Sequence, residues 1–259
     1  MQKIVVTSDL SVRSRPAIQR AVELATTHGA ELIALSVVND DLPGDLARAL
    51  RLGTETILKE QIDEDRAGRP LDIDIRVTTG DPLAIILEQT EDIGADLLVV
   101  GAHRRRPFLD QIRETTVEHV IRASRTPVLL VAGKGTGGYD TVLAGTAFSE
   151  TCTALFRTVP KVAPGAQVTW FNAHPASFAA EAQAEFDTWL SVYGLPKDSP
   201  PPVFFEGSPQ DALESLIEDA SFDLLAIGGH TRADGGRYFI GRFTAGLIRR
   251  PPCDLLIAK

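Results

Sequence analysis

An apolar run that ends in a glycine and a group of cations is the segment of this chain with the most evident chemistry. Residues 97–107 read LLVVGAHRRRP, so the run stops at Gly101 and three arginines follow at 104–106. A glycine lets backbone N–H groups approach an anion, and a guanidinium group binds phosphate through a two-pronged fork. The segment predicts either an anion-binding loop with Arg104 among its contacts or a solvated basic loop. The residues alone leave both readings open.

Other side chains with reactive chemistry are scattered along the chain. Asp9 follows the β-rich run IVVTS, where its carboxylate can face a ligand or close the turn to the next helix. His103 and His230 stand at corresponding places, but no serine, cysteine or carboxylate cluster accompanies them, so polar loop residues are the better interpretation. Cys152 and Cys253 share no metal-ligand spacing. We therefore expect no zinc site and no disulfide framework.

The elements that must position these residues occur twice. GDPLAIILEQTEDIGADLLVVGAH (80–103) aligns without gaps on GSPQDALESLIEDASFDLLAIGGH (207–230), with nine of 24 positions identical. A glycine-rich stretch, 133–139, separates the copies and is suited to a hinge. The repeat predicts two domains, residues 1–133 and residues 134–259.

Each copy alternates β-rich runs with segments of helical periodicity. In the first copy, strands are expected near 4–9, 32–38, 73–79, 96–101 and 127–132, with helices at 15–29, 43–66, 82–93 and 114–124. Continuous apolar strands between helices are typical of a parallel sheet covered on both faces. The predicted fold class is α/β, with two tandem five-stranded, mostly parallel sheets. Ligands of such sheets lie beyond the carboxyl ends of the strands.

Composition argues against several classes of function. Acidic residues number 35 and basic residues 26, giving a formal net charge of −9. This balance argues against a general nucleic-acid or membrane-surface role. The start of the chain does not read as a signal peptide, and no apolar run approaches the roughly 18 residues of a membrane span. A cytoplasmic protein is expected.

Three motifs resemble the universal stress protein family in its tandem form. They are IVVTSDLS (4–11), GDP (80–82), and ADLLVVGAH (95–103) followed by SRTPVLLV (124–131). The resemblance covers nearly the whole chain. It implies a five-stranded α/β fold for each unit, ATP binding in many members, and pairing of units through their last strands. It also implies a phosphate loop of three spaced glycines followed by serine or threonine, with an aspartate after the first strand associated with adenine.

Carried onto this sequence, the resemblance assigns candidate cofactor-binding residues in both copies. They are Asp9, Val38, Gly101, Arg104 and Thr115 in the first copy, and Gly228 and Gly241 in the second.

Neither copy keeps the complete pattern. In the first, Arg104 replaces the second glycine and Glu114 replaces the third. One unpaired carboxylate beside phosphate costs roughly 1 to 4 kcal/mol, or about one to three decades of affinity, which the arginines can offset. In the second copy Ala147, Thr231 and Arg242 replace the aspartate, the second glycine and the hydroxyl. ATP is therefore a candidate cofactor of the first copy, and less so of the second.

Three functions stay open. The leading hypothesis is a non-catalytic stress-response protein whose two units form an internal pseudo-dimer, as a monomer or a homodimer. The second is an ATP-binding switch with at most weak hydrolysis, because the chain has no Walker lysine motif. The third is a binding module for another small molecule. No metal site and no catalytic residue is predicted.

Overall fold

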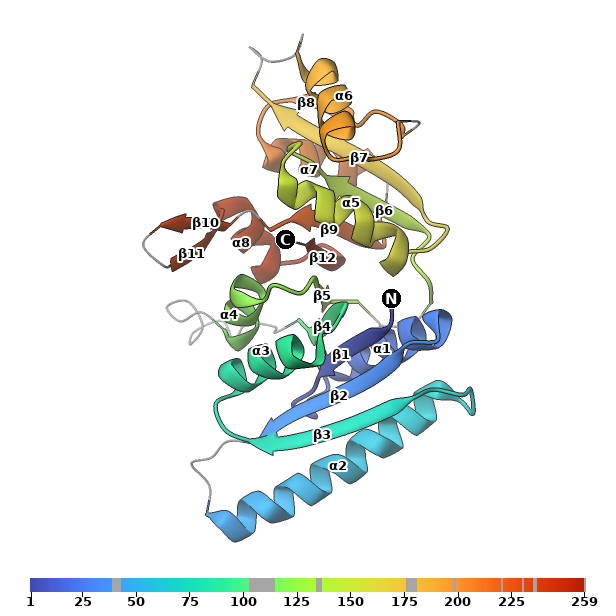
Figure 1. Ribbon diagram of the computed structural model, residues 1–259, viewed down its shortest axis with the longest axis vertical. Helices are drawn as coiled ribbons and strands as arrows, with labels where there is room; N and C mark the ends of the chain where they lie inside the picture. Colours follow the sequence, from blue (N-terminus) through green and yellow to red (C-terminus); the bar gives the residue numbers. More distant parts are fainter. Residues whose placement is uncertain are drawn as a thin grey trace. The chain divides into compact units, whose positions relative to one another are not determined.

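The computed structural model divides the chain into two units (Figure 1). Unit 1 comprises Met1–Gly137 with Ile248–Pro251, and unit 2 comprises Gly138–Leu247 with Pro252–Lys259. The structure describes residues 1–38, 43–102, 115–133, 137–175, 181–197, 199–219, 221–229, 231–234 and 237–258, with the backbone alone for 219, 231–234 and 237–240.

Unit 1 contains the predicted parallel sheet. Its described strands pair in the order β3-β2-β1-β4-β5, and every pairing is parallel. The strands are β1 (Lys3–Thr7), β2 (Glu31–Val38), β3 (Ile73–Thr79), β4 (Leu97–Gly101) and β5 (Val128–Val131). The helices are α1 (Arg15–His28), α2 (Gly44–Arg66), α3 (Pro82–Ile93) and α4 (Thr116–Ala123). These elements confirm the predicted α/β class.

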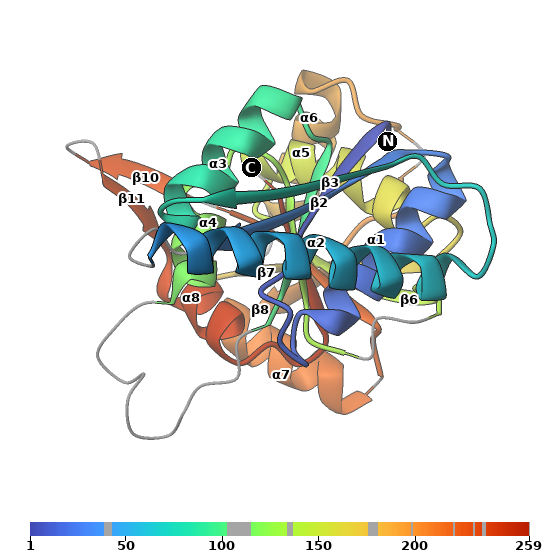
Figure 2. The same cartoon turned by 90° about the horizontal axis from the view of Figure 1, so that it is seen from below.

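Helices cover both faces of this sheet, whose central strands β1, β4 and β5 are buried along most of their length. Ile4, Val5 and Val6 of β1 are completely buried. Helix α1 packs against α2, and α3 packs against α4. Figure 2 shows α1 and α2 on one side of β2 and β3, with α3 on the other. The strand order reverses between β1 and β4, so the crevice expected for ligands lies where these two strands end.

Local signals in the sequence set the ends of several helices. Asp81 precedes α3, and its Oδ1 accepts a hydrogen bond from the N–H of Ala84 at 2.8 Å. Gly29 ends α1 in the left-handed conformation, with φ at 60°. Ser14 precedes α1, but its side chain makes no capping bond to that helix. Its hydroxyl donates instead to the carbonyl of Ser11 at 3.0 Å.

Unit 2 repeats the architecture. Its described strands pair in parallel in the order β12-β9-β6-β7-β8. The strands are β6 (Thr141–Gly145), β7 (Gln167–His174), β8 (Val203–Glu206), β9 (Leu224–Gly228) and β12 (Asp254–Ala258). The helices are α5 (Glu150–Val162), α6 (Ala182–Val192), α7 (Pro209–Asp219) and α8 (Arg242–Arg249).

One element of unit 2 was not predicted. Between β9 and α8, β10 (Thr231–Asp234) and β11 (Arg237–Ile240) form an antiparallel hairpin in a separate sheet (Figure 1). The sequence indicates only a loop there, because TRAD and RYFI are too short to show a clear alternation.

No helix in the described part of the chain is long and apolar enough to span a membrane.

Candidate functional site

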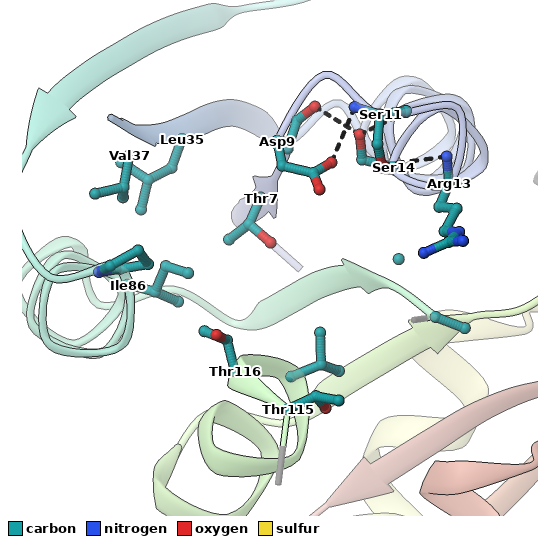
Figure 3. A pocket seen from close by; sticks show the side chains of 15 residues that line it. Thr7, Asp9, Ser11, Arg13, Ser14, Leu35, Val37, Ile86, Thr115 and Thr116 are labelled. Atoms are coloured by element: carbon teal, nitrogen blue, oxygen red, sulfur yellow. Dashed lines mark hydrogen bonds between the residues drawn. The ribbon is translucent and has the colours of Figure 1, made fainter. Parts of the chain in front are cut away.

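A cavity of about 490 Å³ lies at the carboxyl ends of β1 and β4 in unit 1. This is the place where the strand order reverses, and where parallel α/β sheets bind ligands. Figure 3 shows three groups of side chains around it. The turn after β1 supplies a polar wall, β2 and α3 supply an apolar wall, and the start of α4 supplies hydroxyl groups. The lining residues are Thr7, Ser8, Asp9, Ser11, Arg13, Ser14, Leu35, Val37, Pro82, Ile86, Gly101, Ala102, Thr115, Thr116 and Val117.

The polar wall is a turn held together by its own side chains. The N–H of Ser11 donates to Asp9 Oδ1 at 3.0 Å, and the hydroxyls of Ser8 and Ser14 share a hydrogen bond of 2.9 Å. Leu10 adopts a φ of 58°, a left-handed conformation that is uncommon for a non-glycine residue. The N–H of Leu10 donates to the Ser8 hydroxyl at 3.1 Å, which helps to hold this backbone. The turn therefore presents its oxygens in one fixed arrangement.

Asp9 is a carboxylate at neutral pH. Burial is the largest single influence on its pKa and acts to raise it. Hydrogen bonds from the hydroxyl and backbone N–H of Ser11, and from the Ser14 side chain, act in the opposite direction. Together they lower the pKa of Asp9 below its ordinary value of 3.8. Of the two interpretations of Asp9, turn closure is observed, and the same carboxylate also lines the cavity.

Gly101 is required by close backbone packing. A Cβ atom there would lie 2.7 Å from the carbonyl oxygen of Arg13 and 3.2 Å from Cα of Ser14. Real Cβ atoms essentially never approach another atom below 3.0 Å, so the start of α1 could not pack there. The backbone angle of Gly101 is not of the left-handed kind. This glycine therefore brings the β1–α1 turn against β4, and it forms the cavity floor at the same time.

The apolar wall is formed by neighbours of the candidate residue Val38, and not by Val38 itself. Leu35 and Val37 line the cavity together with Pro82 and Ile86. Side chains of a strand alternate between its two faces, so residues 35 and 37 share a face and residue 38 lies on the other. Val38 pairs with Thr79 at the end of β2 and is not part of the lining.

Thr115 joins the cavity to helix α4. Its Oγ1 accepts a hydrogen bond from the N–H of Glu118 at 3.2 Å, while Glu118 Oε2 accepts one from the N–H of Thr115 at 3.0 Å. This reciprocal pair is a capping box, and it satisfies two backbone donors that a helix start leaves open. The Thr115 hydroxyl keeps its own proton for a ligand acceptor. The next residue, Thr116, is exposed on the same rim.

The structure thus brings three of the candidate residues together: Asp9, Gly101 and Thr115. Arg104 and Glu114 lie outside the described residues, as do Arg105, Arg106 and both repeat histidines, His103 and His230. Gly228 and Gly241 belong to unit 2, at the end of β9 and before α8. A Cβ atom on Gly241 would have no neighbour within 4 Å, so no close backbone approach requires that glycine.

Sequence reasoning missed several lining residues. Arg13 is exposed on the rim, and its guanidinium lies at the edge of the cavity in Figure 3. Ile86 is 8% exposed and forms part of the apolar wall. A signal for Ile86 existed: α3 follows directly from Pro82, and residue 86 lies one turn further along the same helix face. No comparable signal existed for Arg13, whose position depends on the turn after β1.

The cysteines and acidic residues form no metal site within the described residues. No group of three His, Cys, Asp or Glu side chains there is placed to hold a metal ion. Cys152 is buried, and burial, with Asp254 nearby, raises the pKa of Cys253 to about 12. A thiol with that pKa is not a nucleophile at neutral pH.

The sequence profile of the universal stress protein family matches residues 1–132 and, a second time, residues 138–259. The chain belongs to the universal stress protein family. The two matches confirm the tandem form that the motifs indicated.

Solved structures of similar fold match nearly the whole length of this chain. A universal stress protein from Archaeoglobus fulgidus DSM 4304 superposes with a TM-score of 0.77 at 17% identity, covering 99% of this chain and 98% of that one. The protein PA1789 from Pseudomonas aeruginosa PAO1, described as functionally unknown, superposes with a TM-score of 0.66 at 18% identity, covering 99% and 92%. At such low identity the likeness concerns the fold of this tandem universal stress protein.

Proposed function

We propose that this universal stress protein is a non-catalytic stress-response protein whose first unit binds an adenine nucleotide. The observation that carries the proposal is the cavity at the ends of β1 and β4, with one apolar wall and one polar wall. An aromatic base fits between Leu35, Val37 and Ile86, and the ionised Asp9 accepts a hydrogen bond from an amino or hydroxyl group.

The opposite rim suits the anionic part of such a ligand. Thr115 and Thr116 offer hydroxyl donors at the start of α4, and Arg13 places a guanidinium on the same cavity. Because the full glycine loop of the family is missing, we expect only a moderate affinity for the nucleotide.

Catalysis is not favoured by the protonation states of the lining. Asp9 is the carboxylate among the described lining residues, and its pKa is lowered. A good general base has a pKa near the working pH, so Asp9 is a weak proton acceptor for an attacking water or hydroxyl group. The expected role is recognition.

Calorimetry with ATP, AMP and adenosine, each with and without magnesium, tests the proposal. Asp9→Asn keeps the shape of the turn but removes the charge, and we expect it to weaken binding about tenfold or more, as for the loss of one charged hydrogen bond. The matched control is Ala147→Asn, at the corresponding and exposed position of unit 2, which should leave binding unchanged. Absence of binding at millimolar nucleotide would reject the proposal. Native mass spectrometry of freshly purified protein would then reveal any other bound small molecule.

We also propose that the two units pair through their last strands as an internal pseudo-dimer. β5 and β12 each stand at the end of the strand order within their own unit, and both are apolar, VLLV and DLLIA. An uncovered apolar edge strand invites aggregation, so natural proteins cover it. Amide hydrogen exchange tests this. Pairing predicts slow exchange for those amides of β5 and β12 that do not donate to their own sheet, and fast exchange at these amides would contradict it.

A further inference from the structure

The repeat permits a residue-by-residue comparison of the cavity with the same place in unit 2. In unit 1, Thr7 is the last residue of β1 and pairs with Leu35 of β2, and both line the cavity. In unit 2, Gly145 is the last residue of β6 and pairs with Phe171 of β7 in the same parallel register. Phe171 therefore occupies the position of the cavity-lining Leu35, and Gly145 that of Thr7.

The Phe171 ring fills this place. A Cβ atom on Gly145 would lie 3.1 Å from Cζ and 3.3 Å from Cε1 of Phe171. The ring thus lies over the end of β6, on the face where Thr7 carries its side chain in unit 1. Phe171 is as buried as Leu35, at 2% against 1% exposed, so the two positions differ in the size of the side chain and not in its burial. The larger aromatic residue and the missing side chain at residue 145 compensate each other, as expected where a space is filled to the density of a protein core.

Further contacts fasten the β6–α5 turn. Asn172, buried on β7, donates from its Nδ2 to the carbonyl of Thr146 at 2.8 Å. Trp189 of α6 donates from its Nε1 to the carbonyl of Ser149 at 3.0 Å. The Phe148 ring lies 5.7 Å from that of Phe186 and 5.8 Å from that of Trp189, centroid to centroid. The corresponding turn of unit 1 is bonded mainly within itself, through Ser8, Asp9, Ser11 and Ser14.

The chemistry of recognition is also missing in unit 2. Ala147 stands where Asp9 stands in unit 1 and supplies no acceptor from its side chain. Leu213 corresponds to Ile86 by the offset of 127 and is similarly buried, at 6% against 8% exposed, so the difference at this place lies in the missing carboxylate.

We propose that Phe171 is an internal plug that closes the ligand site of unit 2, so that one chain binds one nucleotide. The inference rests on the proposed function of unit 1 and adds the number of sites and the residue pair that determines it. Unit 2 is then a permanently closed copy, and the residue pairs 7/35 and 145/171 decide whether a unit of this fold is open or closed.

Two reciprocal transplants test the plug. Gly145→Thr with Phe171→Leu and Ala147→Asp gives unit 2 the residues of unit 1 at these three positions. Thr7→Gly with Leu35→Phe gives unit 1 the residues of unit 2 at the two plug positions. Calorimetry and native mass spectrometry with ATP measure the number of sites, and circular dichroism monitors the fold.

We expect one ATP per chain in the wild type, two in the opened triple variant, and at least a hundredfold weaker binding in the plugged double variant. Asp9→Asn should weaken the single site of the wild type about tenfold or more. Two sites in the wild type would overturn the plug while leaving the proposed function intact. No binding by the wild type would reject both.

The plugged variant keeps the inference testable even where the triple variant fails to fold. A folded Thr7→Gly/Leu35→Phe protein that binds ATP as tightly as the wild type would overturn it. So would a folded triple variant that still takes one ATP.

Discussion

At the scale of single residues, the absence of a Cβ atom explains why a glycine stands at position 101. The sequence suggested a ligand contact for this glycine, and the structure shows a close approach of two backbones. The approach could not be predicted, because it depends on a turn 87 residues earlier in the chain reaching the same strand end, at Ser14. The two interpretations of Asp9 are compatible, because its carboxylate closes the turn and also lines the cavity.

Gly101→Ala should destabilise unit 1 by about 1 to 3 kcal/mol, because the new methyl group would overlap the Arg13 carbonyl oxygen. Denaturant unfolding followed by circular dichroism measures this. The matched control is Gly53→Ala, inside α2, where a Cβ atom meets nothing within 4 Å. The control should stabilise the protein by about 0.5 to 1 kcal/mol, as alanine favours a helix interior. Equal effects of the two changes would contradict this account of Gly101.

Asp9 should also make a small contribution to acid stability. Because its folded pKa is lowered, the ionised form is favoured by folding. The contribution is therefore present above the ordinary pKa of 3.8 and is lost as the pH falls through the lower folded value. Asp9 is partly solvated, so we expect only a few tenths of a kcal/mol. Unfolding free energies of the wild type and Asp9→Asn should differ more at pH 7 than at pH 2.5, and a constant difference would exclude the effect.

At the scale of elements, the sequence predicted most boundaries because apolar periodicity and helix-end residues coincide. β3 at Ile73–Thr79 and α3 at Pro82–Ile93 agree with the expectation to the residue. Helix α4 was expected from residue 114 but begins at Thr116, since Thr115 caps it. Val38 was assigned from the family resemblance, whereas Val37, on the other face of the strand, lines the cavity. Strand ends can thus be predicted more readily than the faces of their last residues.

The capping box of α4 predicts a loss of both stability and affinity. Thr115→Ala removes the acceptor for the Glu118 N–H and should cost about 1 kcal/mol of unfolding free energy. It should also weaken nucleotide binding, since the same hydroxyl lines the cavity. Thr116→Ala, at the neighbouring exposed position, serves as the control for stability and should change it by less than about 0.5 kcal/mol. A stable Thr115→Ala protein would show that the box contributes little.

At the scale of the whole molecule, the two copies of the repeat have diverged from each other at the place of the cavity. Unit 1 keeps a cavity with a carboxylate, and unit 2 has an aromatic cluster of Phe148, Phe156, Phe186, Trp189 and Phe204 near the corresponding turn. Repetition in the sequence predicted the two copies of the fold and the missing aspartate of the second. It did not indicate the plug, because the exchange of Thr7 and Leu35 for Gly145 and Phe171 is visible only once the strand register is known.

The tryptophans can report on the unfolding of one unit alone. Both tryptophans of the chain, Trp170 and Trp189, belong to unit 2, and Trp189 is 3% exposed within the aromatic cluster. Tryptophan fluorescence therefore follows the unfolding of unit 2, whereas circular dichroism follows both units.

ATP at a hundred times its dissociation constant should stabilise the unit that binds it by about 2.7 kcal/mol. If the units form a pseudo-dimer and unfold together, ATP bound in unit 1 shifts the fluorescence and dichroism transitions equally. Asp9→Asn should reduce both shifts, because the same ATP concentration then exceeds the dissociation constant by less. A shift in dichroism alone would show that unit 1 responds independently, which would contradict cooperative pairing of the two units while leaving nucleotide binding in unit 1 supported.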